Sequence, residues 1–79
     1  MKVSLEKAFG EILRELRVHQ RLTQEALAEK SELDRTFISM LERGERQPSL
    51  SSLFKLASAL NTEVSRILKK LEERINENQ

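Results

Sequence analysis

The chain of 79 residues contains no cysteine, tryptophan or tyrosine, one proline, two glycines and one histidine. The absence of cysteine excludes disulfides and thiolate metal sites, and it fits a reducing intracellular compartment. His19 has no carboxylate pair at ligand spacing, so we expect a cation near a helix end rather than a metal ligand or a catalytic base. With no constellation of nucleophile and base visible, the sequence predicts no enzyme, metal or other cofactor.

The sequence also lacks a long apolar run and a strong excess of either charge. No segment approaches the length that spans a membrane, which predicts a cytoplasmic protein without a membrane partner. The formal net charge is +1, too small to hold DNA by bulk electrostatics alone. Between Thr23 and Pro48 the acidic residues outnumber the basic ones. Any contact with nucleic acid must therefore come from the local placement of a few arginines.

Apolar residues recur at helical spacing along the chain, which predicts an all-α fold. Helices are expected at about residues 4–19, 23–30, 34–43, 50–61 and, capped by Thr62, from 63 onward. Ser49 is placed to cap the fourth of them. Gly10 is a mild weakness inside the first of them. A chain this short forms one small domain with a marginal core, so association with a second copy is a reasonable expectation.

The second and third predicted helices are separated only by residues 31–33. A three-residue link forces two helices to cross steeply, which is the helix-turn-helix geometry that projects the second helix into a DNA major groove. Thr23 and Asp34 are placed to cap the two helices, and Gly44 to end the second in the left-handed conformation. Apolar residues stand at the staple positions of both helices, in the pairs Leu22 with Leu27 and Leu33 with Ile38.

The outward face of the second helix of this pair carries residues suited to DNA. Ile38 and Leu41 define its buried direction. On and beside the opposite face stand Arg35, Thr36, Ser39, Met40 and Arg43. Guanidinium groups read guanine or clasp phosphate, hydroxyls reach base edges, and apolar groups meet the thymine methyl. Gln24, at the start of the preceding helix, suits a phosphate site.

Several short segments stand along the chain in a characteristic order: Leu22-Thr23-Gln24-Glu25, Leu27-Ala28, Ile38-Ser39, Leu41-Glu42-Arg43-Gly44, Pro48-Ser49, Leu53, Leu56-Ala57 and Ala59-Leu60. Together they resemble the lambda repressor/Cro-like helix-turn-helix family, also called the XRE family, from roughly Phe9 to Leu68. Within that family the short chain and the run from Leu33 to Ser39 resemble the small controller proteins of restriction-modification systems. The resemblance implies a compact five-helix, lambda-repressor-like DNA-binding domain.

The same resemblance implies that a homodimer binds double-stranded operator DNA, with residues 34–43 as the recognition helix. It places Arg35, Thr36, Ser39 and Met40 at base-facing positions and Gln24, Arg43 and Arg46 at phosphate-facing positions. Two positions depart from the family pattern. Glu32 occupies a turn position often held by glycine, and Met40 stands where polar base-contacting residues are common.

The residues at positions 35–46 that are predicted to contact DNA can also be interpreted as ordinary surface residues. The surface interpretation places Arg35 near Asp34, and Arg43 and Arg46 in pairs with Glu42 or Glu45. In this interpretation the hydroxyls of Thr36 and Ser39 lie on a solvated helix face, and the side chain of Met40 only fills space at a partly exposed position. Phe37 is expected to be partly in the core, with a sugar-phosphate contact as the alternative.

The last predicted helix carries an apolar stripe that continues past Leu68, where a five-helix core can close. We therefore divide the chain into a helix-turn-helix domain, residues 1–68, and a C-terminal helical extension, residues 69–79. Ile67, Leu71 and Ile75 are predicted to pack against a two-fold mate. The alternative is that they fold back on the first helix of their own chain.

The sequence thus predicts a transcriptional regulator that binds a palindromic operator as a homodimer, with no small-molecule effector evident. The alternative function is an antitoxin-like or other protein-interaction module. In that case the C-terminal helix binds a partner protein and DNA binding is secondary.

Overall fold

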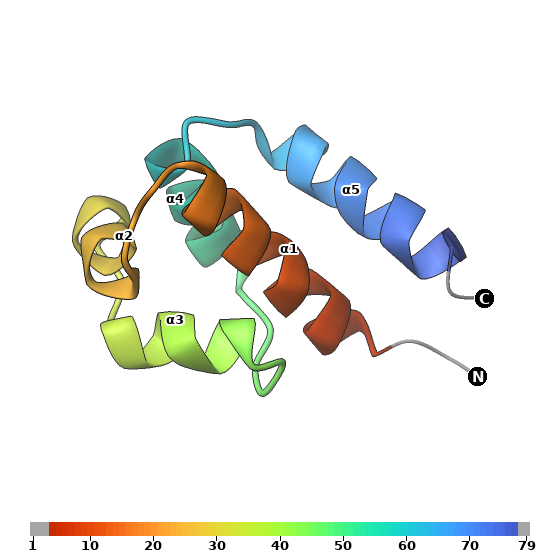
Figure 1. The fold of residues 1–79 in the computed structure, drawn as a ribbon, viewed down its shortest axis with the longest axis horizontal. Helices are drawn as coiled ribbons and strands as arrows, with labels where there is room; N and C mark the ends of the chain where they lie inside the picture. The colour runs from red at the N-terminus through yellow and green to blue at the C-terminus, as the bar shows by residue number, and fades with distance from the viewer. Residues whose placement is uncertain (1–3, 78–79) are drawn as a thin grey trace.

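A computed structural model describes residues 4–77, which form five helices and no strand (Figure 1). The helices are α1 (Leu5–His19), α2 (Gln24–Ser31), α3 (Arg35–Glu42), α4 (Leu50–Ala59) and α5 (Val64–Glu77). The predicted all-α, five-helix fold is confirmed. α1 lies between α3 and α5 and packs against both, while α2 packs against α3 and α4. None of the helices within residues 4–77 is long and apolar enough to cross a bilayer.

Two of the predicted N-terminal caps are formed, and two are not. The hydroxyls of Thr23 and Ser49 accept hydrogen bonds from the amides of Ala26 and Ser52, at 3.0 and 3.1 Å. Asp34 has the extended backbone of a capping residue, but its side chain makes no cap hydrogen bond, so that prediction was wrong for the side chain.

The predicted cap at Thr62 was wrong by one residue. α5 begins at Val64, and the carbonyl of Glu63 accepts the first helical hydrogen bond, from the amide of Ile67 at 3.3 Å. Glu63 therefore occupies the capping position.

The C-terminal ends of α1 to α4 share one backbone conformation. In each case a residue with positive φ follows the helix, at Arg21, Glu32, Gly44 and Asn61. After α3 the amides of Gly44 and Glu45 donate to the carbonyls of Leu41 and Met40, which is the hydrogen-bond pattern of a Schellman cap. The predicted role of Gly44 is thereby confirmed, with φ +76°. Glu32 takes the same conformation at φ 60° without glycine's freedom.

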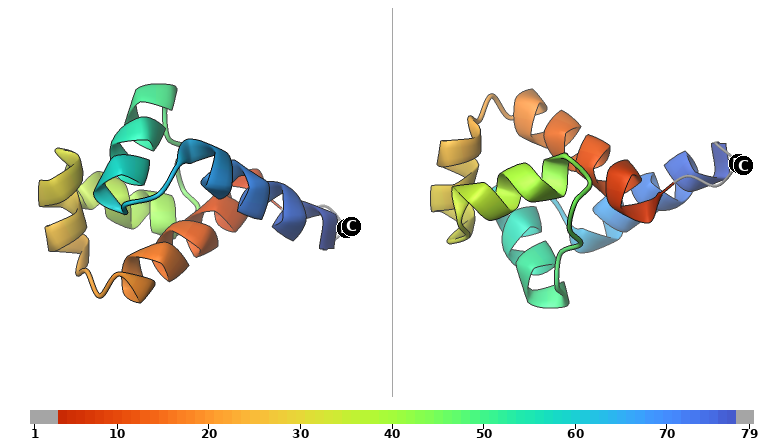
Figure 2. Two further views of the ribbon diagram at one scale, coloured as in Figure 1. Left: turned by 90° about the horizontal axis from the view of Figure 1, so that it is seen from above. Right: turned by 90° about the horizontal axis from the view of Figure 1, so that it is seen from below.

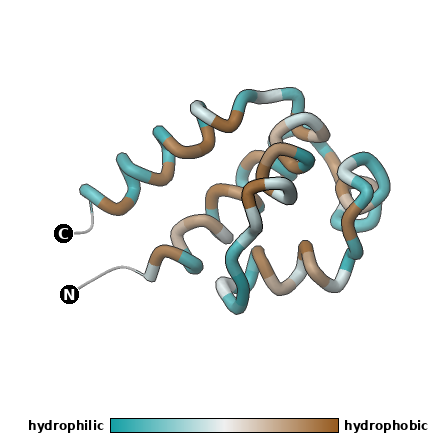
Figure 3. The backbone as a smooth tube through the Cα atoms, turned by 180° about the vertical axis from the view of Figure 1, so that it is seen from behind, coloured by the Kyte–Doolittle hydropathy of each residue, from teal (hydrophilic) through white to brown (hydrophobic). Residues whose placement is uncertain are grey.

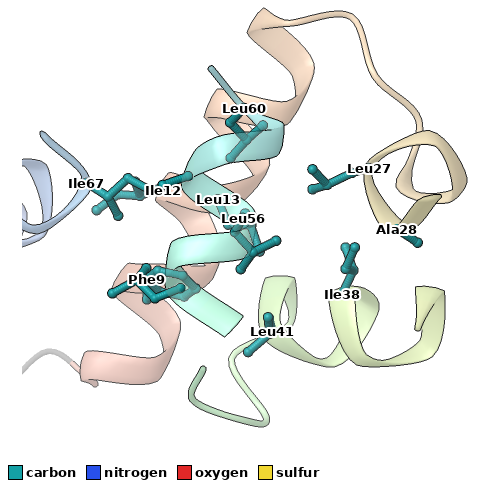
Figure 4. Packing of buried hydrophobic residues seen from close by; sticks show 12 residues of the cluster. Phe9, Ile12, Leu13, Leu27, Ala28, Ile38, Leu41, Leu56, Leu60 and Ile67 are labelled. Atoms are coloured by element: carbon teal, nitrogen blue, oxygen red, sulfur yellow. The ribbon is translucent and has the colours of Figure 1, made fainter. Parts of the chain in front are cut away.

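The core lies where α1, α3, α4 and the start of α5 meet the inner face of α2 (Figure 4). The largest fully buried side chains are Ile12, Leu13, Leu27, Ile38, Leu41, Leu56, Leu60 and Ile67. In Figure 4, Ile38 and Leu41 point from α3 into this core, as their spacing predicted. Phe37 is half-buried and packs against the same cluster, which confirms its expected place.

Gly10 is more than a weak point in a helix. It is buried, and a Cβ atom at this position would lie 2.4 Å from the carbonyl oxygen of Leu41 and 2.7 Å from that of Glu42. Only glycine therefore lets the C-terminal carbonyls of α3 approach α1 so closely. The interpretation of Gly10 as a mild weakness missed this packing role.

α5 folds back along α1 of its own chain. Ile67 is 2% exposed within the core, and Leu71 packs against that core as a half-buried side chain. Arg74 donates hydrogen bonds to Glu11 and Glu15 of α1, at 3.2 and 2.9 Å. Because the side chain of Ile67 is buried within its own chain, it is not available to a second copy. The expectation that Ile67 packs against a two-fold mate therefore needs correction. α5 also continues without a break across residues 68 and 69.

Some apolar side chains remain outside the core. In Figure 3 the turns of α5 alternate between apolar and polar residues as far as the end of the helix. Five large apolar side chains are exposed among the described residues: Leu5, Val18, Leu50, Phe54 and Leu68. Leu50 and Phe54 belong to α4 and Leu68 belongs to α5, so both helices carry exposed apolar side chains.

Candidate nucleic-acid interface

The link between α2 and α3 gives the two helices their steep crossing. α2 ends at Ser31, and Glu32 turns the chain in the left-handed region, with φ 60° and ψ 35°. The amide of Leu33 donates to the carbonyl of Ala28 at 3.1 Å. Leu33 is half-buried against the core. The chain therefore turns at once into α3, which lies along one edge of the molecule (Figure 1).

A buried ion pair joins α3 to α1. The guanidinium of Arg17 donates to both carboxylate oxygens of Glu42, Nε to Oε2 at 2.6 Å and Nη2 to Oε1 at 3.0 Å. The two side chains are 13% and 5% exposed. Arg17 Nη1 also donates to the carbonyl of Leu22 at 2.9 Å. The hydrogen bonds with Glu42 raise the pKa of Arg17 above its ordinary value. This network ties the end of α3 to the segment that leads into α2.

Gln24, predicted to contact phosphate, belongs to the same network. Its Nε2 donates to Glu42 Oε1 at 3.1 Å. The side chain is half-buried at the first position of α2. The amide group is thus oriented by α3, next to the free backbone N–H groups of the first turn of α2.

Two of the predicted base-facing residues, Arg35 and Thr36, are exposed in the first turn of α3. Arg35 Nε lies 3.2 Å from Glu25 Oε2 of α2. The alternative interpretation had placed Arg35 near Asp34, and the ion pair instead crosses to α2. Met40 is half-buried in the last turn, so only part of it faces solvent.

Arg43 brings two neighbours together at the end of α3. Its Nε and Nη2 donate to the carboxylate of Glu45, at 2.9 and 3.2 Å, and its Nη1 donates to the hydroxyl of Ser39. The hydrogen bond from Arg43 lowers the pKa of Glu45 below its ordinary value. All of these side chains lie at the surface. Two predicted site residues, Ser39 and Arg43, are therefore in direct contact.

Arg46 interacts with an aromatic ring rather than with the acids proposed for it. Its guanidinium carbon lies 5.9 Å from the centre of the Phe37 ring, within the range of a cation–π contact. Glu42, the other acid considered, faces Arg17 in the interior. Arg46 thus stands over the same side of α3 from which Phe37 emerges.

A model of the helix-turn-helix family matches residues 13–67. The chain belongs to this family. The control protein C.SmaI of Serratia marcescens is 44% identical over 66 residues, which are 84% of this chain and 79% of that protein. The crystal structure of the restriction-modification controller protein C.AhdI from Aeromonas hydrophila superposes with a TM-score of 0.77 at 45% identity, over 78% of this chain and 94% of that one.

A third relative is seen with its DNA. The controller protein C.Esp1396I, as a tetramer in complex with its natural 35 base-pair operator, has a TM-score of 0.83 at 31% identity. The match covers 94% of this chain and 97% of that one. As a member of the helix-turn-helix family, this chain is a DNA-binding transcriptional regulator, and the family is not one of enzymes. The resemblance seen in the sequence is confirmed, including its narrower form.

Two residues that hold side chains of the helix-turn-helix were missed from the sequence, Arg17, which binds Glu42, and Glu25, which binds Arg35. Arg17 follows Leu13 by four residues, so both lie on one side of α1, and this spacing was a signal of partial burial. Glu25 carried no such signal, because its distance from Arg35 depends on how α2 and α3 cross. No group of three or more histidines, cysteines or acids within residues 4–77 is arranged to hold a metal. His19 is exposed in the last turn of α1.

Proposed function

We propose that this regulator acts in the cytoplasm as a homodimer that binds a palindromic operator and reads each half-site with α3. The observation that carries the proposal is the division of α3 into two faces. Ile38 and Leu41 are fully buried, whereas Arg35 and Thr36 are exposed on the other side. A helix held in this way presents its outer side chains to the edges of the bases.

In this proposal the base contacts come from Arg35, Thr36, Ser39 and Met40. Arg35 has the donor geometry for the O6 and N7 atoms of guanine, and the two hydroxyls reach base edges. Met40 is half-buried, so its exposed part suits a thymine methyl rather than a hydrogen bond. These contacts set the sequence that is bound.

The phosphate contacts are assigned to Gln24, Arg43 and Arg46. Gln24 lies at the N-terminus of α2, where free N–H groups favour an anion, and Glu42 holds its side chain in place. Arg43 and Arg46 follow the end of α3 and are exposed. Their loss should weaken binding to all duplexes alike and flatten the dependence of log K on log salt by about one per arginine.

The dimer is proposed to form through the outer faces of α4 and α5. Leu50 and Phe54 of α4 are 75% and 62% exposed, and Leu68 of α5 is 42% exposed. Leu68 shares a helical stripe with Leu71 and Ile75, both half-buried. The last turns of α5 project beyond the other helices (Figure 2). In this scheme residues 69–79 extend the domain of residues 1–68 and contribute to dimerisation.

The experiment that tests the proposal is selection of bound duplexes from a random pool, followed by binding to the selected and to a scrambled duplex. Arg35→Ala should cost about 1–3 kcal/mol on the selected duplex and relax the preference at one base pair, as lost bidentate contacts do. Arg14→Ala, a change of an exposed arginine on α1, is the control and should keep the preference. An unchanged ratio in Arg35→Ala would remove Arg35 from the base-contacting set.

A protein-interaction module is the second candidate function. The apolar surface at Leu50 and Phe54 favours it, because a partner protein is an alternative occupant of such a patch. If no sequence is enriched from the random pool, the result supports the protein-interaction function, and the operator proposal fails.

A further inference from the structure

Two of the arginines assigned to DNA are already engaged by acids within the same chain. Arg35 Nε lies 3.2 Å from Glu25 Oε2, with side chains that are 57% and 68% exposed. Arg43 Nε lies 2.9 Å from Glu45 Oε2, with side chains that are 55% and 51% exposed. Neither acid belongs to α3 itself. One comes from α2 and the other from the loop that follows α3.

We propose that Glu25 and Glu45 compete with DNA for Arg35 and Arg43 and thereby set the affinity of the interface. This inference rests on the proposed function, in which the two arginines contact DNA. Each arginine must leave a carboxylate before it engages a phosphate or a guanine. Binding is then an exchange of one anionic or acceptor group for another, so each arginine contributes less than a solvated one would.

The exposure of the two pairs makes such an exchange feasible. Ion pairs between exposed side chains are weak, so the duplex can displace the carboxylates. The Arg17–Glu42 pair is the internal contrast, because its side chains are only 13% and 5% exposed and further hydrogen bonds to Leu22 and Gln24 hold it. That pair has a structural role, whereas the pairs at Glu25 and Glu45 lie on the surface that faces DNA in the proposed function.

The exchange also explains how the net-acidic helix-turn-helix segment limits the affinity for DNA. After the arginines turn to DNA, the released carboxylates remain beside the duplex and repel its phosphates. The two effects add, and a single subunit gains little from its arginines. A regulator built in this way depends on the paired contacts of a dimer for useful affinity.

The test compares Glu25→Gln and Glu45→Gln, which keep side-chain shape and remove the charge, with Glu11→Gln. Glu11 of α1 is 63% exposed and pairs with Arg74, and the proposed function assigns it neither to DNA nor to the dimer, so this control changes the net charge by the same amount at a neutral site. Dissociation constants are measured by fluorescence anisotropy on the selected duplex and on a scrambled duplex. Circular dichroism establishes that each variant is folded. Each of the two test variants should bind about twofold to fivefold more tightly than the native protein, as the strength of exposed ion pairs implies.

A double-mutant cycle separates competition for the arginine from simple repulsion of DNA. In an Arg35→Ala background, Glu25→Gln should tighten binding clearly less than in the native background, because no guanidinium remains to be released and only the repulsion between Glu25 and the phosphates is removed. Tightening of equal size in both backgrounds, or equal tightening by Glu11→Gln, overturns the inference. So does the absence of any tightening by Glu25→Gln and Glu45→Gln. If Arg35→Ala leaves binding to the selected duplex unchanged, the proposed function fails at Arg35 independently of the cycle.

Discussion

The carboxylate of Glu42, at the last position of α3, accepts two hydrogen bonds from the guanidinium of Arg17 in α1. The two residues are 25 positions apart in the sequence. Glu42 also accepts a hydrogen bond from Gln24, so one carboxylate fixes α3 relative to both α1 and the N-terminus of α2. The orientation of α3, the recognition helix of the proposed function, therefore depends on a side chain that faces the interior.

Breaking this pair should destabilise the fold. Arg17→Met leaves the buried carboxylate of Glu42 without its counter-charge, a loss that typically costs about 3–5 kcal/mol. Replacing both residues in Arg17→Met with Glu42→Met removes the buried charge as well and should recover much of that loss. Urea unfolding followed by circular dichroism measures both effects.

Arg14→Met is the matched control for the ion pair, because Arg14 is exposed on the same helix. Its unfolding midpoint should stay close to that of the native protein. A similar midpoint for Arg17→Met, or a double variant less stable than Arg17→Met alone, would show that the ion pair does not hold α3.

Glycine at position 32 should stabilise the protein. Glu32 has φ 60°, a conformation that costs a non-glycine residue about 1–2 kcal/mol. The greater freedom of glycine in the unfolded chain offsets about 0.4–1 kcal/mol of this. We therefore expect Glu32→Gly to raise the free energy of unfolding by about 0.5–1 kcal/mol, measured by urea titration.

Glu29→Gly serves as the opposite control, since residue 29 lies inside α2. Glycine there should lower the free energy of unfolding by about 1 kcal/mol. Equal effects of the two substitutions would mean that the backbone at residue 32 is not the source of strain.

Alanine at position 10 should destabilise the protein although alanine favours helices. The added Cβ would meet the carbonyl oxygens of Leu41 and Glu42 well inside contact distance, so α3 must shift away from α1. Overpacking of this kind costs about 1–3 kcal/mol, against a gain of about 1 kcal/mol in helix propensity. A lower melting temperature for Gly10→Ala is expected, whereas a higher one would show that α3 moves freely.

The local features of the fold followed from the sequence because their causes are local. Thr23 lies three residues from the amide that it caps, and Gly44 ends α3 through bonds to the last turn. The buried face of α3, with Ile38 and Leu41, followed from helical spacing alone. Asp34 failed as a side-chain cap because residue type predicts where a cap stands and not whether its rotamer makes the bond.

The features that failed to follow are those set by packing between helices. The Arg17–Glu42 pair and the contact of Arg35 with Glu25 depend on how α1, α2 and α3 cross. The burial of Ile67 depends on where α5 meets the core, and a helical stripe alone does not divide itself between an intrachain and an intermolecular side. The DNA and dimer roles of the residues in the interface stay predictions for the same reason, since each concerns a partner.

Dimerisation is the remaining prediction, and the exposed apolar side chains of α4 and α5 show which substitutions should test it. Phe54 and Leu68 are 62% and 42% exposed, so lysine at these positions leaves the monomer core intact. If the two side chains are buried in a dimer, each contributes about 1.5–3 kcal/mol. Phe54→Lys with Leu68→Lys should therefore yield a folded monomer that protects one half-site, instead of two half-sites about 34–36 Å apart.

Sedimentation velocity, circular dichroism and DNA footprinting decide the outcome together. Val18→Lys is the control, because Val18 is an exposed apolar residue on α1 outside the proposed interface. Leu71→Lys is expected to unfold the chain, since Leu71 packs against its own core, while Ile75→Lys should weaken the dimer without unfolding. If Phe54→Lys with Leu68→Lys remains dimeric and Val18→Lys becomes monomeric, the interface lies on α1. A native protein that sediments as a monomer at all concentrations and protects a single half-site would refute the dimer altogether.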